Sequence, residues 1–439
     1  MDAALLSRIQ FAVTVGFHFI FPPLSIGLGW LVFFMLWRQR KTADESWDQS
    51  ARFWLKILAL TFAVGVATGI VMEFQFGTNW AGYSRFVGDI FGAPLAAEAI
   101  FAFFLESTFL GVLFWGWEKL SARGRMWSAF LVALGATLSA FWIIVANSWM
   151  QTPAGFEIRG GRAELVDFWA AVFNPSTLPR YLHTITACVL SGAFFMLGIS
   201  AWYLIKAREV DFATRSFKVA LFAAAIFSVV QLPLGHFHAV QVAETQPEKL
   251  AAFEGLFETQ KEAPLLLFGV PDADQGRTRG AVAVPGLLSF LVAFDTEHQV
   301  KGLKDFSRDE WPPLGLTFFP FHLMFLLGLY FIGLSGLGLL LLWQKKLFEQ
   351  RWYLRLAFLS LALPLVANEL GWLAAEVGRQ PWIVYHVMKT ADAFSINVPA
   401  GQVLASLLIF SLVYLLLGAL WVFLVIKQVK SGPQTTRGE

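Results

Sequence analysis

Long apolar runs, each bounded by short charged segments, repeat along almost the whole sequence. Each run has about the twenty residues that an α-helix needs to cross the hydrocarbon of a bilayer. The pattern predicts nine membrane-spanning helices, at residues 9–37, 53–78, 93–117, 127–148, 181–205, 217–235, 315–343, 353–376 and 399–426. We therefore expect an all-α, polytopic membrane protein.

Composition supports this fold class. The 439 residues are 57% hydrophobic and 15% charged, and the mean hydropathy is +0.60. Soluble domains carry about a quarter charged residues, so this chain has too little charge to cover a globule in water. A net charge of +2 gives no basic surface for nucleic acid, which we exclude as a partner. The single cysteine excludes a disulfide framework.

Lys and Arg residues gather in alternate loops, at residues 38–52, 119–125, 206–218 and 345–355, and again in the tail after residue 426. The loops between these are poor in basic residues. Because basic loops stay in the cytoplasm, the C-terminus is expected to be cytoplasmic and the N-terminus outside.

The predicted organisation is one integral membrane domain in three parts. Residues 1–235 hold helices one to six, residues 236–314 form an outer loop, and residues 315–439 hold helices seven to nine and the cytoplasmic tail. A loop of this length is usually functional or disordered. Its apolar piece, residues 282–292, is too short to span and is expected at the membrane interface.

A few ionisable residues lie inside the apolar runs, where an unpaired charge is costly. His18 lies in the outer half of the first run and is followed by Pro22 and Pro23. These prolines cannot donate to the carbonyls of His18 and Phe19, so the helix should kink there. His18 is then either a haem ligand or a histidine hydrogen-bonded within the bundle.

His183 and Met324 can reach a similar depth in the outer half of the fifth and seventh helices. A histidine with a methionine is a six-coordinate haem pair suited to electron transfer, although methionine on an apolar helix is more often a packing residue. His322 lies two residues before Met324 and points to another face of the helix.

The third helix carries Glu98 and Glu106, with Ser107 next to the second carboxyl. Eight residues place the two carboxyl groups about 12 Å apart along the axis. Buried carboxyl groups can exchange protons near neutral pH, so the pair is interpreted as a proton relay. The alternative is neutralisation by Lys or Arg from other helices.

The eighth helix ends with NELGWLAAEVGRQPW, in which Trp372 and Glu376 share one face. Arg379 follows and is expected to pair either with Glu376 or with a haem propionate. In the second helix, Gly65 and Gly69 form a small-residue face, for which close helix packing is the favoured explanation.

Four strings together, GVATGIVMEFQFGTNW, VGDIFGAPLAAEAIFAFFLESTF, ANSWMQTP and GWLAAEVGRQPW, closely resemble subunit I of the cytochrome bd-type quinol oxidases. The resemblance covers nearly the whole chain, and the outer loop resembles that of the short quinol-loop subgroup. It implies a haem-bearing terminal oxidase of nine helices. Such an enzyme oxidises quinol at the outer face and reduces O2 to water with cytoplasmic protons, so it generates a proton motive force without pumping.

The resemblance also implies roles for the residues above. His183 and Met324 look like the axial ligands of a low-spin haem b. His18 and Glu376 look like ligands of two high-spin haems, b and d, without an assignment of either ligand to either haem. Trp372 lies beside them and Glu98 at the oxygen-reducing haem, while Glu106 with Ser107 looks like part of the proton path from the cytoplasm.

In the outer loop, the string KLAAFE places Lys249 and Glu254 where the family has quinol-contacting residues. A carboxylate there can accept a quinol proton. The main departure is His322, where many relatives have Arg; displacement of His183 or Met324 by His322 as a ligand is left open. His236 and His238 match no family residue that we can identify.

The implied cofactors are three haems, a low-spin b, a high-spin b and a d, with haem b in place of d as an open alternative. The implied partners are a second large membrane subunit, a small single-helix subunit, ubiquinol or menaquinol, and O2. The implied location is the cytoplasmic membrane of a bacterium or archaeon. A rival function from another class is a carrier or channel that uses Glu98 and Glu106 for proton coupling.

Overall fold

The computed structural model describes residues 2–433. Within this range, nine helical segments are long and apolar enough to cross a membrane, as the sequence predicts. Their bounds are Ala3–Thr42, Glu45–Thr78, Ala81–Trp115, Ala122–Gln151, Thr177–Ile205, Val210–Thr245, Leu314–Trp343, Arg351–Val377 and Ala400–Ser431. The all-α, polytopic fold class is therefore confirmed, and the end of the expected tail, residues 434–439, lies outside the described part.

The first span is broken where the two prolines predict a kink. Helix α1 (Ala3–His18) ends at the candidate ligand, and α2 (Phe21–Thr42) begins with Pro22 and Pro23 in its first turn. Proline fits the first turn of a helix, where its missing N–H has no intrahelical partner. His18 is consequently the last residue of its helix.

Two further spans are interrupted in ways that the apolar pattern does not reveal. The third span consists of α4 (Ala81–Ala97), a π-helical turn η1 (Glu98–Phe103) and α5 (Phe104–Trp115). Single π-turns inside α-helices occur frequently at functional sites, and this one begins at Glu98. The eighth span is divided into α13 (Arg351–Leu359) and α14 (Leu363–Val377), the second of which starts with a proline in its first turn.

The other spans are the single helices α3 (Glu45–Thr78), α6 (Ala122–Gln151), α8 (Thr177–Ile205), α9 (Val210–Thr245), α12 (Leu314–Trp343) and α15 (Ala400–Ser431). Helix α9 continues well past residue 235, where the sixth span is expected to end. The expected loop start at residue 236 therefore falls inside the helix, and His236 and His238 are helical. Hydropathy marks the hydrocarbon layer, whereas a helix can continue beyond it into the polar region.

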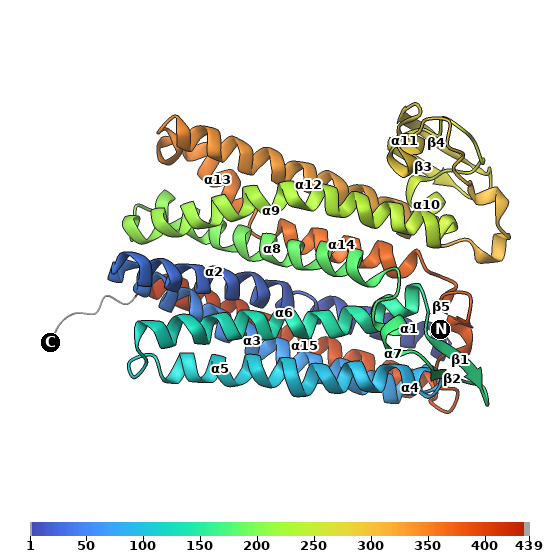
Figure 1. Ribbon diagram of the computed structural model, residues 1–439, viewed down its shortest axis with the longest axis horizontal. Coiled ribbons are helices and arrows are strands. Elements are labelled where there is room, and N and C mark those ends of the chain that lie inside the picture. The colour runs from blue at the N-terminus through green and yellow to red at the C-terminus, as the bar shows by residue number, and fades with distance from the viewer. Residues whose placement is uncertain (1, 434–439) are drawn as a thin grey trace.

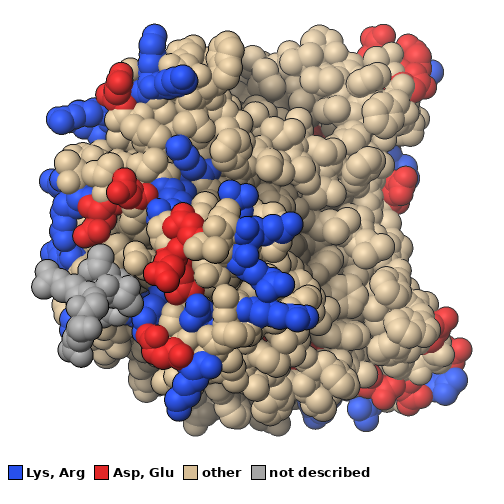
Figure 2. Space-filling model, turned by 60° about the vertical axis from the view of Figure 1, so that its left-hand side comes forward, with Lys and Arg blue, Asp and Glu red and all other residues tan. Residues whose placement is uncertain are grey.

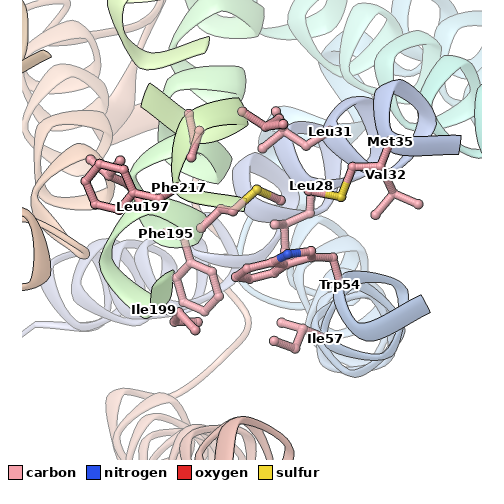
Figure 3. Packing of buried hydrophobic residues seen from close by; sticks show 14 of the residues in the cluster. Leu28, Leu31, Val32, Met35, Trp54, Ile57, Phe195, Leu197, Ile199 and Phe217 are labelled. Atoms are coloured by element: carbon pink, nitrogen blue, oxygen red, sulfur yellow. The ribbon is translucent and has the colours of Figure 1, made fainter. Parts of the chain in front are cut away.

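Helix α8 lies at the centre of the bundle, packed against α9, α2 and α13 (Figure 1). The largest core cluster fills the space between these helices and α3. Figure 3 shows part of it: Leu28, Leu31, Val32 and Met35 from α2, Trp54 and Ile57 from α3, Phe195, Leu197 and Ile199 from α8, and Phe217 from α9. The indole of Trp54 donates to the buried hydroxyl of Ser216 on α9 at 3.0 Å. This core fixes the half of the bundle opposite the outer loop.

The start of α1 and the end of α15 lie at opposite ends of the bundle (Figure 1). Lys and Arg side chains gather at one end, and the band between the two ends carries few charges on the face that Figure 2 shows. This arrangement suits a bilayer around the band. The side of the membrane that each terminus faces stays a prediction.

The outer segment between α9 and α12 is more ordered than a solvated loop. It consists of α10 (Pro247–Glu254), an antiparallel hairpin of β3 (Leu265–Asp272) and β4 (Arg277–Val284), α11 (Leu287–Ala293), and the short turns η2 (Leu303–Asp305) and η3 (Arg308–Glu310). The apolar piece 282–292 is divided between β4 and α11, and its location at the membrane interface stays a prediction. The aromatic rings of Phe253 on α10 and Phe321 on α12 stack at 4.5 Å, which docks α10 on the bundle.

Short elements close the same end of the molecule. They are the hairpin β1 (Phe156–Arg159) and β2 (Arg162–Leu165), α7 (Phe168–Val172), the hairpin β5 (Trp382–Val384) and β6 (Met388–Lys389), and η5 (Thr390–Asp392). The turn η4 (Leu347–Glu349) lies between α12 and α13.

Candidate functional site

A cavity of about 1690 Å³ occupies the half of the bundle nearest the outer segment. Pockets for single drug-sized ligands measure about 300–1,000 Å³, so this one has room for more than one large group. Most of its wall is apolar. The candidate residues that line it are His18, Glu98, Glu106, His183, Glu254, His322, Met324, Trp372, Glu376 and Arg379. The fold thus brings candidate residues from five spans and the outer segment to one chamber.

His18 has its ring fixed by the second span. Its Nδ1 lies 3.0 Å from the hydroxyl of Thr68, which itself donates to the carbonyls of Val64 and Gly65. Thr68 therefore accepts from Nδ1–H, and Nε2 keeps its lone pair. A second ring hydrogen bond of this kind is what orients a metal-binding histidine.

The two glycines of the second span make room for this corner. A side chain at Gly69 would lie 3.1 Å from the ring of His18, and one at Gly65 would lie 3.2 Å from Phe21. Close packing of α3 on the broken first span is therefore confirmed as their role, and Gly69 additionally borders the cavity.

His183 and Met324 reach the cavity from different helices. The amide nitrogen of Gln231 on α9 lies 3.1 Å from both ring nitrogens and from the carbonyl oxygen of His183 on α8. The ring of His238 lies 5.7 Å from that of His183. Met324 faces α14, where a side chain at Gly371 would come within 2.7 Å of its sulfur. Both predicted ligands line the chamber, and their pairing on one haem stays a prediction.

Glu98 and Glu106 both line the cavity from the third span, Glu98 as the first residue of the π-turn and Glu106 on α5 after it. Ser139 on α6 donates to Glu98 at 2.6 Å. Glu106 is buried where α5 crosses α6 most closely, since a side chain at Gly135 would fall 2.7 Å from its backbone nitrogen. Ser107 lies off the cavity wall and donates to the carbonyl of Phe103 at 2.7 Å. No ion pair of Glu98 or Glu106 with Lys or Arg occurs within residues 2–433, so the predicted alternative of neutralisation finds no support.

Glu376 is held by several protein groups. Its Oε2 accepts from Arg379 at 2.5 Å, which is the first of the two pairings expected for that arginine. Its Oε1 accepts from Asn147 at 3.1 Å and from Gln151 at 3.3 Å. Arg180 lies 3.8 Å from the same oxygen. Ligation of iron by Glu376 would have to replace one of these contacts. Trp372, on the same helix, also borders the cavity.

Lys249 and Glu254 lie on α10 but face different surroundings. Lys249 is 2% exposed, and its ammonium donates to Gln151 at 2.7 Å and to Gln246 at 3.0 Å, away from the cavity wall. Burial, with the Arg180 guanidinium nearby, lowers the pKa of Lys249 well below its usual value. Glu254 does line the cavity, and burial raises the pKa of its carboxyl to about 8.

His322 joins α12 to the outer segment. Its Nδ1 lies 3.0 Å from the carbonyl of Phe318 on the same helix, and its Nε2 lies 2.9 Å from the carbonyl of Leu266 on β3. Both nitrogens therefore face carbonyl oxygens of the protein. This arrangement argues against the open alternative that His322 replaces His183 or Met324 as a ligand.

The cavity fits a haem-type group on three observations. Its wall is mostly apolar, which suits a macrocycle, and His18 presents an unbonded Nε2. Three guanidinium nitrogens at the cavity, Nε and Nη1 of Arg379 and Nε of Arg180, are buried without a hydrogen-bond partner in the described part of the chain. Buried donors of this kind match carboxylate groups, which a haem carries at its edge.

Sequence reasoning missed the polar residues that support the site. Glu376 is contacted by Arg180, Asn147 and Gln151. His183 is contacted by Gln231, and Lys249 by Gln151 and Gln246. Asn147 and Gln151 stand in the string ANSWMQTP, where polar residues four apart at the end of an apolar run share a helix face. That spacing indicates that Asn147 and Gln151 face the same side of the helix. It does not indicate which residues they contact.

The fold and the chamber define a multi-pass membrane protein with an internal site of the kind that membrane-bound haem proteins need. The family model described as "Cytochrome bd terminal oxidase subunit I" matches residues 6–433, and the chain belongs to this family. It is thus a subunit of an oxidoreductase, a terminal oxidase, for which haem is expected.

Three relatives illustrate the similarity. The chain is 41% identical to "Cytochrome bd ubiquinol oxidase subunit 1" of Bacillus subtilis over 99% of this chain and 95% of the relative. It is 36% identical to "Cytochrome bd-II ubiquinol oxidase subunit 1" of Escherichia coli over 100% of this chain and 98% of the relative. The solved bd oxidase from Geobacillus thermodenitrificans superposes with a TM-score of 0.93 at 32% identity, covering 98% of this chain and 99% of that one.

Proposed function

We propose that this chain is the catalytic subunit of a quinol:oxygen oxidoreductase, oxidising quinol at the outer segment and reducing O2 to water with protons from the cytoplasm. The observation that carries the proposal is the single cavity, which joins His18, His183, Met324 and Glu376 to Glu254 of the outer segment. Family membership and the names of the relatives support the reaction.

Three haems are proposed for the cavity. His183 and Met324 would hold a low-spin haem b, and His18 and Glu376 would hold two high-spin haems, b and d or b and b, with Glu98 at the oxygen site. Trp372 would pack against them, and Arg379 and Arg180 would meet their carboxylates. Haem iron supplies one-electron transfer and, where a coordination position is open, a place for O2 to bind.

On the quinol side, Glu254 is the proposed proton acceptor. Its pKa of about 8 means that it can take a proton from a quinol hydroxyl near neutral pH and release it again. Its Oε2 is buried without a hydrogen-bond partner among the described residues, so it is free to accept. Lys249 is also proposed to belong to the quinol site. Its ammonium does not line the cavity, so it would act indirectly, through its hydrogen bonds to Gln246 and Gln151.

On the oxygen side, Glu106 and Glu98 are proposed to hand protons along the third span, with Ser107 at the start of the path. Both carboxyl groups border the cavity, and Glu98, at the start of the π-turn, accepts from Ser139. Electrons enter from the outer end and protons from the inner end, so charge separates across the membrane without a pump.

The assembly is proposed to contain a second large membrane subunit and a small single-helix subunit, in a bacterial or archaeal cytoplasmic membrane. The substrate is proposed to be ubiquinol or menaquinol. Seven of the nine spans of the described chain have less than two fifths of their most apolar stretch buried within this chain. These faces leave ample surface for lipid and for other subunits.

The decisive experiment combines spectroscopy with turnover. The purified complex should show haem bands in a reduced-minus-oxidised spectrum and should consume O2 when given a quinol. Absence of both haem and quinol-driven O2 uptake would overturn the proposal and favour the carrier or channel. Absence of a chlorin band alone would replace haem d by haem b.

A paired variant tests the ligand assignment. His183→Ala should abolish the low-spin haem signal, because the iron loses its imidazole. His298→Ala, at an exposed position of the outer segment, should leave the spectrum unchanged. A normal low-spin signal in His183→Ala would contradict the assignment.

A further inference from the structure

The hairpin and helix α11 of the outer segment expose large apolar side chains. We call this set the hairpin patch: Leu267, Phe268, Val270, Val282, Val284, Phe290 and Phe294. Phe268 is 62% exposed and Phe294 is 68% exposed, and Phe268 pairs with Val282 across the two strands. Contiguous exposed apolar side chains of this kind mark a surface that meets a membrane or another protein.

Two contacts place the hairpin patch beside the membrane spans instead of above them. The carbonyl of Leu266 on β3 lies 2.9 Å from Nε2 of His322, a residue about 12 Å along the axis from the first residue of α12. Phe294 rests against His236 at 5.5 Å, and His236 lies about 14 Å from the last residue of α9. The outer segment therefore descends along α9 and α12, on the side of the bundle that Figure 1 shows above α12.

Apolar side chains on the two neighbouring helices continue this surface. Leu316, Leu323 and Leu326 on α12 and Leu232 and Phe237 on α9 are half-exposed or more exposed. They belong to spans whose apolar stretches are only 22% and 39% buried within the chain, so these faces are available to lipid. The hairpin patch and the exposed apolar side chains of α9 and α12 therefore lie on neighbouring elements.

The backbone and charges of the hairpin limit how deep it can lie. Its outer strand edges carry unpaired backbone groups, which hydrocarbon does not tolerate. The turn end of the hairpin bears Asp272 on β3, Asp274 in the turn, and Arg277 and Arg279 on β4, with an ion pair of 3.1 Å between Arg279 and Asp272. The apolar middle of the hairpin and its charged tip together fit the boundary between headgroups and acyl chains.

The cavity reaches this same surface. Leu267 and Phe294 of the hairpin patch line the cavity although they are exposed, and so do Leu232 on α9 and Leu326 on α12. A side chain that is both exposed and cavity-lining borders an opening. One opening of the cavity thus lies between α9 and α12, under the outer segment and on the side of the cavity that Glu254 lines.

We propose that the hairpin patch lies in the headgroup and acyl boundary of the adjacent leaflet and roofs a lateral opening between α9 and α12, through which quinol dissolved in the bilayer reaches Glu254. The second half of this statement rests on the proposed function. The first half concerns only the position of the outer segment relative to lipid.

Site-directed spin labelling tests the position. Cys188 is the single cysteine and is buried, so Phe268→Cys can be labelled selectively in the assembled complex in nanodiscs, with the unsubstituted complex as background. The matched control is Gln275→Cys at the exposed tip of the same hairpin. The label at residue 268 should be relaxed more by O2 than by a water-soluble nickel chelate, and the label at residue 275 should show the reverse. Preference of the residue 268 label for the nickel chelate, or protection from both reagents by another subunit, would overturn the proposal.

A bulky substitution tests the opening. Leu326→Trp should raise the KM for quinol several-fold while kcat and the haem spectrum stay unchanged, because it narrows the entrance without touching the ligands. Leu340→Trp, at an exposed position of α12 that does not line the cavity, is the control. An unchanged KM in Leu326→Trp would refute the lateral opening. If the unsubstituted complex does not oxidise quinol, the proposed function fails, and the spin-label result still decides the position of the hairpin.

Discussion

Glu254 offers the sharpest test of the proposed chemistry, because its protonation should control the rate of quinol oxidation. Its side chain is 4% exposed, it borders the cavity, and its Oε2 has no hydrogen-bond partner in the described part of the chain. Burial raises the pKa of the carboxyl from 4.5 to about 8. A proton acceptor works only when ionised, so the active form is populated as the pH rises through this value.

The expected magnitude follows from that pKa. For a pKa of about 8, roughly a tenth of the enzyme has an ionised Glu254 at pH 7 and roughly nine tenths at pH 9. The kcat/KM for quinol should therefore rise by about an order of magnitude between these pH values. Glu254→Gln, which cannot accept the proton, should be slow and should lose this rise. Glu254→Asp should retain a pH-dependent rate.

The assay is O2 uptake with a short-tailed quinol, corrected for enzyme-free quinol oxidation at each pH. Haem spectra of each variant show that the cofactors remain bound. A one-electron donor that has no proton to release provides the control, and its oxidation should not depend on Glu254. A Glu254→Gln enzyme with the same rise in kcat/KM as the unsubstituted enzyme would refute the reasoning.

Two glycine substitutions probe close contacts in the bundle. In Gly371→Ala, the new carbon would lie 2.7 Å from the Met324 sulfur instead of about 3.5–4.0 Å, so the sulfur should move by about 1 Å. This movement should alter the low-spin haem spectrum. An unaltered spectrum would argue against Met324 as a ligand. Gly27→Ala places a carbon 2.8 Å from the Cα of Gly192 and should destabilise the α2–α8 contact by about 1–3 kcal/mol, measured as a lower Tm of the complex. Gly328→Ala, with open space around it, is the control for both and should change neither quantity; an equal loss of stability there would contradict the contact argument.

The sequence predicts the number of spans correctly because crossing hydrocarbon requires a long apolar run, and that requirement is local. The break after His18 is equally local, since Pro22 and Pro23 remove backbone donors whatever surrounds them. The pairing of Arg379 with Glu376, one helical turn apart, belongs to the same class of inference.

Other features needed contacts between segments distant in sequence. The π-turn at Glu98 has no signature in the apolar pattern. Hydropathy detects only the part of a helix inside the hydrocarbon, so it does not show that α9 continues past residue 235. The hairpin of the outer segment consists of short strands, which mixed polar and apolar residues do not distinguish from a loop. His322 illustrates the limit, because its partner on β3 lies 56 positions earlier in the chain.

By itself, the sequence determined that the protein is a nine-span membrane protein, which residues are polar within those spans and, through its motifs, the family that it resembles. Only the tertiary structure decided that Arg180, Asn147 and Gln151 converge on Glu376, and that Lys249 turns away from the cavity that Glu254 borders. The physical reason is that apolar runs and prolines determine structure within one helix. The hydrogen-bond partner of a buried polar group, by contrast, comes from another helix, and only the packing of the bundle decides which one.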